Sequence, residues 1–512
     1  MIGDPTDIAA ARGFDPNRPP APPDVSAACA RDLAVRKDYN AAADMAVRCI
    51  EHRIYDIPFL YEAAYWMIYV NRLNQITDIL WPAYSSLCLT SYERMSEKDR
   101  SWWSTKSHEI GQEILGKGGL HECVRFFYLA DILDHRPVHA FCIHLAHIIR
   151  RMRDQATELG EPLGKSLPEG PRNVVAYVVW GEEYVRAFLE YHMRSMLAPN
   201  NLPVLTGEHN FISIVTTPEG RRLIEAHPIM ERVKAIADVR YFIFPEFLTE
   251  SSHYSNPDYY FYLLYGMLDH VNIFFAKTLG ANVFFLPVDA IVANGSIMHM
   301  RRYMQEGSDS CGNSNLVAKR ESFLPALDEV RAGKEELILS TRELANLALK
   351  HAHQYVTSQL VIPENADFGK WARELFWPTE NGIVAHSIYT HPLCVSARAI
   401  TSPFQMSYKW VDFFLTDRLF PSAADIPRFK VATDPNEVYI NNFAPESRRF
   451  ETTGKMFEPE TFIAAHLHSR PVHRHMMTQR QIIPCDTPLR TNRDPDEDVA
   501  TIMAAIQERA PL

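Results

Sequence analysis

Residues 276–289 read Ala-Lys-Thr-Leu-Gly-Ala-Asn-Val-Phe-Phe-Leu-Pro-Val-Asp, and this stretch decides the fold class. It holds the end of a long helical pattern, then Gly280, then the apolar run 283–286. A glycine just after a helix is a common C-cap, and a short continuous apolar run is typical of a strand buried on both faces. The stretch therefore predicts a helix followed by a buried strand that ends close to Asp289.

The same alternation of strand and helix extends on both sides of this stretch. Continuous apolar strands that alternate with helices indicate a mainly parallel sheet with helices on both faces. We therefore predict an α/β domain of the Rossmann-like kind over residues 171–446. The further strands are predicted at 174–179, 211–216 and 239–244, and the helices at 184–197, 218–226, 258–279 and 342–351.

Upstream of this domain the pattern is helical. Ala42, Met45, Ala46 and Cys49 recur at helical spacing, and no strand-like alternation interrupts residues 24–160. We predict an all-α domain of stacked helical hairpins, a form that often binds a protein partner. Residues 158–171 are rich in glycine and proline and lack an apolar period, so we place a linker and the domain boundary there.

The two ends of the chain differ from its middle. Residues 1–23 include the run Pro-Asn-Arg-Pro-Pro-Ala-Pro-Pro, which predicts an extended leader because proline fixes φ and lacks the amide proton. Such a leader acts as a tether or as a ligand for an aromatic groove. Residues 447–512 read as an irregular extension with a short helix near its end.

Composition excludes several classes of protein. Of the 512 residues 46% are hydrophobic, and the net charge is −11, so the chain is not expected to coat nucleic acid. No apolar run is long enough for a membrane span, and the start lacks the pattern of a signal peptide. Eight cysteines without a CxxC pair are typical of reduced thiols, so we expect a cytoplasmic protein.

Candidate binding residues follow from the predicted sheet. In an open α/β sheet, ligands bind at the carboxyl ends of the strands. Asp289, at the end of the fourth strand, is either a cap of the next turn or a ligand for a metal or a sugar. The other residues at or beyond these ends are Trp180, Gly181, Glu182, Tyr184, Thr216, Glu246, Asn294, Gly295 and Ser296.

The segment from Ala276 to Asp289, with Asn294, Gly295 and Ser296 after it, resembles the centre of the GT-A nucleotide-sugar glycosyltransferases. In that family a helix and a strand lead to Asp-x-Asp, and a glycine precedes the next helix. The second carboxylate of the motif falls on Asp289, while Pro287 stands in place of the first. The resemblance covers roughly residues 171–445 and extends to uncharacterised bacterial GT-A-like proteins.

The resemblance implies a function. It implies transfer of a sugar from a nucleotide-diphosphate donor to an unidentified acceptor, with Mn²⁺ or Mg²⁺ held by Asp289 and by a late histidine, His391. The strand-end residues named above would bind the nucleotide. Because Pro287 replaces a carboxylate, the chain either relies less on metal or is a catalytically silent scaffold, and both alternatives stay open.

Other polar clusters are candidates on the residues alone. Asp434 and Glu437 form an acidic cluster that we interpret as catalytic, although an aspartate followed by proline at the start of a turn explains it equally well. His135 and His139 share a helix face, and a second group of histidines surrounds His466 and His473. Neither group has a recognised ligand spacing, and we interpret the second as a polar exposed segment.

Overall fold

A computed structural model describes residues 25–117, 119–249, 257–388, 391, 393–400, 415–416, 419–420, 422–434, 436–467 and 469–510. The chain divides into two compact units, each of which is described by itself. The first comprises Met1–Arg151, Leu248–Met267 and Gln405–Tyr408, and the second comprises the remaining segments. The predicted leader, residues 1–23, lies outside the described residues.

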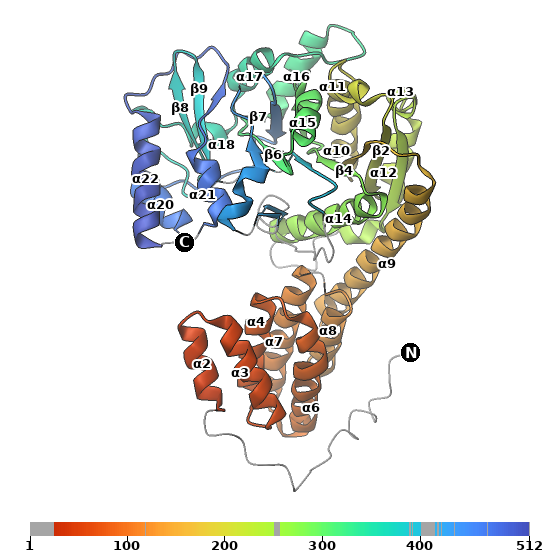
Figure 1. Ribbon diagram of the computed structural model, residues 1–512, viewed down its shortest axis with the longest axis vertical. Coiled ribbons are helices and arrows are strands. Elements are labelled where there is room, and N and C mark those ends of the chain that lie inside the picture. The colour runs from red at the N-terminus through yellow and green to blue at the C-terminus, as the bar shows by residue number, and fades with distance from the viewer. Residues whose placement is uncertain are drawn as a thin grey trace. The chain divides into compact units, whose positions relative to one another are not determined.

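Between Ala27 and Ser166 every described element is a helix (Figure 1). Polar N-caps explain where several of them begin. The Ser26, Asp38 and Asp56 side chains accept hydrogen bonds from the amides three residues on, at 3.1, 3.1 and 2.7 Å. The helices are α2 (Ala27–Val35), α3 (Tyr39–Glu51), α4 (Ile57–Tyr69), α5 (Leu73–Gln75), a π-helix (Ile76–Leu80), α6 (Trp81–Ser91), a 3₁₀ turn (Tyr92–Arg94), α7 (Glu97–Gly116), α8 (Glu122–Leu133) and α9 (Pro137–Ser166).

These helices pack as consecutive neighbours. Helix α2 packs along α3, α3 along α4, and α7 along α8. Small and apolar side chains at helical spacing are fully buried where the helices meet, among them Ala42, Ala46, Ala63 and Met67. The helical pattern of the sequence is therefore confirmed as a set of helices.

The second unit contains one large sheet. Its order is β11-β6-β10-β4-β1-β2-β3 in the described part of the chain. Strands β1, β2, β3 and β4 are parallel, as are β6 and β11, while β10 runs antiparallel between β4 and β6. The strands are β1 (Arg172–Val178), β2 (His209–Thr216), β3 (Asp238–Ile243), β4 (Asn282–Phe285), β6 (Ser310–Gly312), β10 (Cys394–Val395) and β11 (Phe429–Val431). The predicted α/β class and its first four strands are confirmed.

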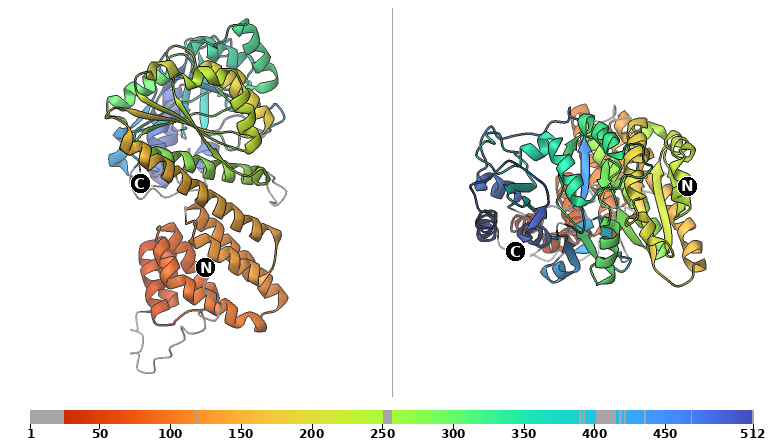
Figure 2. Two further views of the ribbon diagram at one scale, coloured as in Figure 1. Left: turned by 90° about the vertical axis from the view of Figure 1, so that its right-hand side faces the viewer. Right: turned by 90° about the horizontal axis from the view of Figure 1, so that it is seen from above.

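Helices cover both faces of this sheet (Figure 2). On one face Val175, Tyr177 and Ile212 pack in a single core with residues of α10 (Glu182–Ala187), α12 (Pro218–Ala226), α13 (Ile229–Lys234) and α15 (Ser296–Gln305). On the other face α14 (Pro257–Leu279) approaches the strands: the Ser213 hydroxyl donates to Asn272 Oδ1 at 2.6 Å, and Phe211 meets Phe275 edge-on. The strands are therefore apolar on both sides, as the continuous runs predicted.

Two smaller sheets complete the second unit. The first has the order β5-β12-β7, and the second β13-β9-β8. Their strands are β5 (Ala290–Val292), β7 (Val317–Lys319), β12 (Ile440–Ala444), β8 (Glu374–Thr379), β9 (Gly382–Ser387) and β13 (Gln481–Ile483). Helices α16 (Arg320–Arg331), α17 (Thr341–Lys350) and α18 (Gln354–Thr357) belong to this part of the chain. Because β5 begins directly after Asp289, the first small sheet continues from the end of β4.

The linker prediction for residues 158–171 is wrong, because α9 continues through it to Ser166. Its glycines have a packing role. A Cβ at Gly160 would lie 1.9 Å from the Thr278 hydroxyl oxygen, and one at Gly164 would lie 2.8 Å from the Thr278 carbonyl oxygen. The two glycines thus let α9 approach the end of α14 closely. The two compact units separate at Met152, within α9.

The prediction of an irregular tail after residue 446 is also wrong. Helices α20 (Pro459–His466), α21 (Pro471–Thr478) and α22 (Pro495–Arg509) form there, and β13 pairs with β9. Phe462, Met477 and Ile502 are buried in one core with Trp377 of β8. None of the helices in the described ranges is long and apolar enough to cross a membrane.

Candidate functional site

The large sheet has a topological switch point between β1 and β4. From β1 the chain moves outward to β2 and β3 on one side, whereas β4 adds on the other side. In open α/β sheets a crevice forms at such a point, outside the carboxyl ends of the strands. Trp180–Tyr184 follow β1 and Asp289 follows β4, so both predicted segments flank this point.

The antiparallel strand β10 brings a third segment to the same edge. The amide of Phe285, at the end of β4, donates to the Leu393 carbonyl oxygen at 2.9 Å. His391 Nε2 lies 3.2 Å from the Phe285 carbonyl oxygen, which can only accept, so Nε2 is the donor. The structure therefore brings His391 to the carboxyl edge of the sheet.

Asp289 is half-buried at this edge. Its main-chain oxygen accepts the Phe443 amide of β12 at 2.9 Å. Burial raises the pKa of its carboxyl to about 6, while its own amide and the positive charges of His391 and Arg320 act in the opposite direction. Asp289 thus lies among cationic side chains in surroundings that disfavour its charge, a combination that is common at functional sites.

Arg320 is a site residue that the sequence reasoning missed. It is the first residue of α16, directly after β7. Arg320 Nη1 lies 2.7 Å from Glu183 Oε1, and its side chain is only 18% exposed. Because Glu183 follows β1 and Arg320 follows β7, this ion pair joins the two sheets beside Asp289. The adjacent basic pair Lys319-Arg320 at a strand end was the signal available in the sequence.

Tyr184 and Arg448 complete the cluster. Burial raises the pKa of the Tyr184 hydroxyl, and the negative charge of Asp289 adds to this, whereas Arg320 and Arg448 lower it. Tyr184 is therefore electrostatically coupled to Asp289 and to both arginines. Arg448 is exposed and its guanidinium lies over the Phe450 ring, 5.6 Å from the ring centroid. We call Tyr184, Asp289, Arg320, His391 and Arg448 the carboxyl-edge cluster.

The remaining residues predicted near β1, β2 and β3 have mixed placements. Gly181 has a φ of +77°, which a residue with a side chain rarely adopts, and Trp180 packs edge-on against Phe244. Glu182 and Glu246 are exposed. Thr216 is fully buried under the first turn of α12, where a Cβ at Gly220 would lie 2.2 Å from its hydroxyl oxygen. Thr216 therefore packs in the core beneath α12.

The residues predicted after β5 hold the fold together. Asn294 Oδ1 accepts the Asn200 amide at 3.0 Å, and the Gly295 amide donates to Asn201 Oδ1 at 3.1 Å. The Ser296 hydroxyl is buried and donates to the Tyr439 carbonyl oxygen at 3.1 Å. These groups anchor the start of α15 at the far end of β5, which the sequence could not distinguish from a ligand-binding turn.

The acidic cluster Asp434 and Glu437 is also engaged by neighbours. Glu437 contacts Arg302 and Tyr303 of α15, and Asp434 Oδ1 accepts the Asn436 amide at 2.9 Å. Although burial acts against it, the hydrogen bonds from Tyr303 and Arg302 hold the pKa of Glu437 below its usual value. The charges that act on Glu437 are thus different from those that act on Asp289. The structure does not bring Glu437 into one cluster with Asp289.

Of the four histidines named in the two groups above, His135 is exposed, with 79% of its side chain accessible, whereas the other three lie in the protein core. His139 is 1% exposed and its ring lies 4.9 Å from that of His108, and burial lowers the pKa of both. His466 and His473 are also buried, and His466 Nε2 lies 2.7 Å from the Ala372 carbonyl oxygen. The interpretation of the second group as an exposed polar segment is therefore wrong.

Among the described residues, the carboxyl edge offers at most two protein ligands for a divalent ion. Within the described ranges no group of three or more His, Cys, Asp or Glu side chains is arranged to hold a metal. Asp289 and His391 offer one carboxylate and one imidazole. This pair fits an ion such as Mg²⁺ or Mn²⁺ only if phosphate oxygens and water supply the other positions.

Comparison with protein-family models and with curated proteins finds no match to this chain. The case for a function therefore depends on the cluster itself. Its composition is one half-buried carboxylate, one histidine, one tyrosine and two arginines at a switch point, and this favours a ligand with several negative charges.

Proposed function

We propose that this chain is a glycosyltransferase with a GT-A-like α/β domain, which transfers a sugar from a nucleotide-diphosphate donor to an unidentified acceptor. The observation that supports this most directly is the meeting of Asp289 and His391 at the switch point. They come from segments about one hundred residues apart, and the resemblance assigned both to the same ion. Strand β10, which begins three residues after His391, runs antiparallel to β4, so its start lies at the carboxyl edge.

The two arginines give the cluster a second means of binding a diphosphate. Breaking the glycosidic bond leaves negative charge on the nucleotide diphosphate, and fixed cations stabilise that charge. Glu183 holds Arg320 in place at 2.7 Å, so this guanidinium is already ordered before a ligand arrives. Arg320 and Arg448 thus compensate for the carboxylate that Pro287 replaces. They reduce the dependence of the reaction on metal.

A divalent ion, when bound, would neutralise the leaving diphosphate as a Lewis acid and would be held by Asp289 and His391. The chain's own residues then have separate tasks. Arg320 and Arg448 bind and orient phosphate oxygens, and the Tyr184 ring lies beside them as a wall of the donor site. Gly181, at positive φ, lets the main chain after β1 come close to the nucleotide.

The alternative function is a catalytically silent scaffold, and Pro287 is the observation that favours it. In this case the helices of the first unit bind a protein partner and the carboxyl-edge cluster is a relic. The two functions differ in whether the purified chain binds nucleoside diphosphates at all.

The test begins with thermal unfolding of the full chain in the presence of UDP, GDP, CDP and dTDP, each with and without Mn²⁺. A ligand that binds only the native state raises the melting temperature by mass action. We expect one nucleotide to raise it in the wild type and in the control Asp486→Asn, an exposed carboxylate that pairs with Arg342. We expect a smaller rise in Arg320→Gln.

Turnover of the matching nucleotide sugar is then measured by release of the nucleoside diphosphate. Release by the wild type, reduced in Asp289→Asn and Arg320→Gln, supports the transferase. If none of the four nucleotides changes the melting temperature of the wild type, the scaffold function is correct instead.

A further inference from the structure

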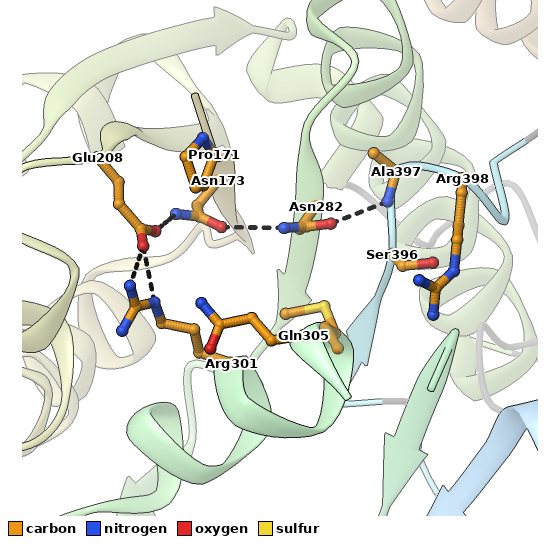
Figure 3. Close-up of a pocket in the computed structure, with 10 residues that line it drawn as sticks. Pro171, Asn173, Glu208, Asn282, Arg301, Gln305, Ser396, Ala397 and Arg398 are labelled. Carbon is orange, nitrogen blue, oxygen red and sulfur yellow. Dashed lines mark hydrogen bonds and ion pairs between the residues drawn. The ribbon is translucent and has the colours of Figure 1, made fainter. Parts of the chain in front are cut away.

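A cavity of about 300 Å³ lies at the opposite edge of the same sheet, at the amino ends of β1 and β4 (Figure 3). Its walls come from four parts of the second unit: the starts of these strands, the residue before β2, the second half of α15 and the residues after β10. This edge is not where open α/β sheets usually bind ligands, so the residues that line it need a separate explanation.

An asparagine stands in register at the start of three adjacent strands. Asn173 of β1 pairs with Asn210 of β2 on one side and with Asn282 of β4 on the other. Asn173 Nδ2 donates to Asn210 Oδ1 at 3.0 Å, and Asn282 Nδ2 donates to Asn173 Oδ1 at 3.3 Å. The row ends where Asn282 Oδ1 accepts the Ala397 amide at 3.0 Å. Asn173 and Asn282 of this amide row line the cavity.

The amide row also holds a carboxylate that fixes an arginine. Glu208, whose side chain is 9% exposed, accepts a hydrogen bond from Asn173 Nδ2 at 2.6 Å. Arg301 of α15 donates from Nε to Glu208 Oε1 at 2.7 Å, and its Nη2 contacts the same oxygen. Arg301 Nη1 has no hydrogen-bond partner among the described residues. The guanidinium is thus held by Glu208 at the cavity wall.

A second arginine is held in the same way on another wall. Asp309, whose side chain is 3% exposed, contacts the guanidinium groups of Arg398 and Arg428 and accepts the Ser396 hydroxyl at 2.8 Å. Arg398 Nη2 donates to the Ser308 carbonyl oxygen at 2.8 Å. Arg398 Nη1 has no partner within the described ranges. Its place in the cavity wall is therefore fixed by a buried carboxylate that does not itself line the cavity.

We propose that this cavity binds a small molecule that carries carboxylate or phosphate groups, with Arg301 at one end of the cavity and Arg398 at the other (Figure 3). The lining carries two guanidinium groups against one carboxylate, so its net charge is positive although the chain as a whole is acidic. The planar fork of arginine matches the geometry of both anions, and guanidiniums that are ordered before binding lose less entropy on binding. A cavity of this volume has room for a small metabolite and not for a polymer.

The inference does not depend on the proposed transferase activity. The cavity shares no residue with the carboxyl-edge cluster. An anion at the amino edge would lie against α15 and the residues around β10, and the latter connect to His391. Occupation of the cavity would therefore stabilise the strand that positions His391.

The experiment compares melting temperatures in millimolar sodium phosphate, sodium succinate and sodium chloride at equal ionic strength. The variants are Arg301→Gln and Arg398→Gln, and the control is Arg302→Gln, on the same helix as Arg301. Excluded salts such as phosphate stabilise all variants alike, so only the difference between variants reports on the cavity. We expect phosphate, succinate or both to stabilise the wild type and Arg302→Gln more than the two cavity variants.

Two further measurements keep the result decisive. Arg301→Gln leaves Glu208 without its cation, so the double variant Arg301→Gln/Glu208→Gln, which removes both charges, is included in case the single variant fails to fold. Equilibrium dialysis of radiolabelled phosphate and succinate gives the binding directly, and the control Asp486→Asn should bind as the wild type does. Equal stabilisation and equal binding in all variants, or no binding of either anion to the wild type, would overturn the proposal.

Discussion

The two edges of the large sheet shift the pKa values of their carboxylates in opposite directions. At the carboxyl edge, burial raises the pKa of Asp289 to about 6, and no side chain of the described residues donates a hydrogen bond to it. At the amino edge, burial alone would raise the pKa of Asp309, but hydrogen bonds from Arg398, Ser396 and Arg428 bring it below its usual value. The carboxylate of Asp309 is thus paired with protein donors, whereas the surroundings of Asp289 disfavour its negative charge.

This difference separates a site suited to catalysis from a site suited to binding alone. A carboxylate that lacks side-chain donors is available to an incoming ligand, and its free-energy cost is typical of functional positions. Arginines fixed by buried carboxylates present an unchanging surface, which suits recognition without chemistry. The predictions below test this contrast, from the largest expected effect to the smallest.

The largest effect is expected for Asp289→Asn. The variant keeps the size of the side chain and removes its charge, so sugar transfer should fall by about two orders of magnitude, roughly 2.7 kcal/mol of transition-state stabilisation. Release of nucleoside diphosphate from the nucleotide sugar measures it. Unchanged turnover in a well-folded variant would remove Asp289 from the mechanism.

Asn173→Ala should be the most destabilising single change at the amino edge. It deprives Glu208, Asn210 and Asn282 of a hydrogen-bond partner at once, and groups left unpaired in a buried position cost about 1–3 kcal/mol of unfolding free energy. Chemical denaturation measures the loss. Asn346→Ala is the matched control, since that exposed amide bonds only Asp486 in the described chain. Equal stability of the two variants would show that the amide row is not needed for folding.

The pH dependence of stability should reveal the cost of Asp289. Its folded pKa of about 6 lies above the value near 3.8 of an unfolded chain, so between these two values the folded state binds more protons. Ionisation of this carboxyl therefore lowers the free energy of unfolding by about 1–3 kcal/mol as the pH rises from 4 to 6. Asp289→Asn removes this contribution. We expect the melting temperature of Asp289→Asn to exceed that of the wild type by more at pH 7 than at pH 4, both measured in metal-free buffer. A difference that does not change with pH would contradict the raised pKa.

The smallest effect is expected for Glu437→Gln. The sequence made this residue a catalytic candidate, but Arg302 and Tyr303 engage its carboxylate in a half-exposed ion pair, and such pairs contribute about 0–1 kcal/mol. Transfer should change less than about threefold, because no reacting charge depends on this group. A loss as large as that of Asp289→Asn would restore Glu437 to the catalytic machinery and place the acceptor near α15.

By itself the sequence determined the local elements. Continuous apolar runs and helical spacing predicted the first four strands of the sheet and the helices between them, because burial on both faces leaves a direct pattern in the residues. It also placed Asp289 at a strand end. The amide row was detectable as well, since Arg172-Asn173, His209-Asn210 and Ala281-Asn282 each precede an apolar run, but a lone asparagine before a strand is too common to indicate its partners.

Only the tertiary structure decided which residues meet. The glycines of residues 158–166 predicted a linker, but they allow close packing of α9 against α14. The polar tail after residue 446 forms helices because Trp377 and its neighbours cover the apolar side chains of the tail. Arg320 joins Asp289 because it follows β7 and pairs with Glu183, which follows β1, and His391 joins it because β10 runs antiparallel to β4. Strand order and direction depend on contacts between segments far apart in the chain, and these leave no periodic pattern within any one segment.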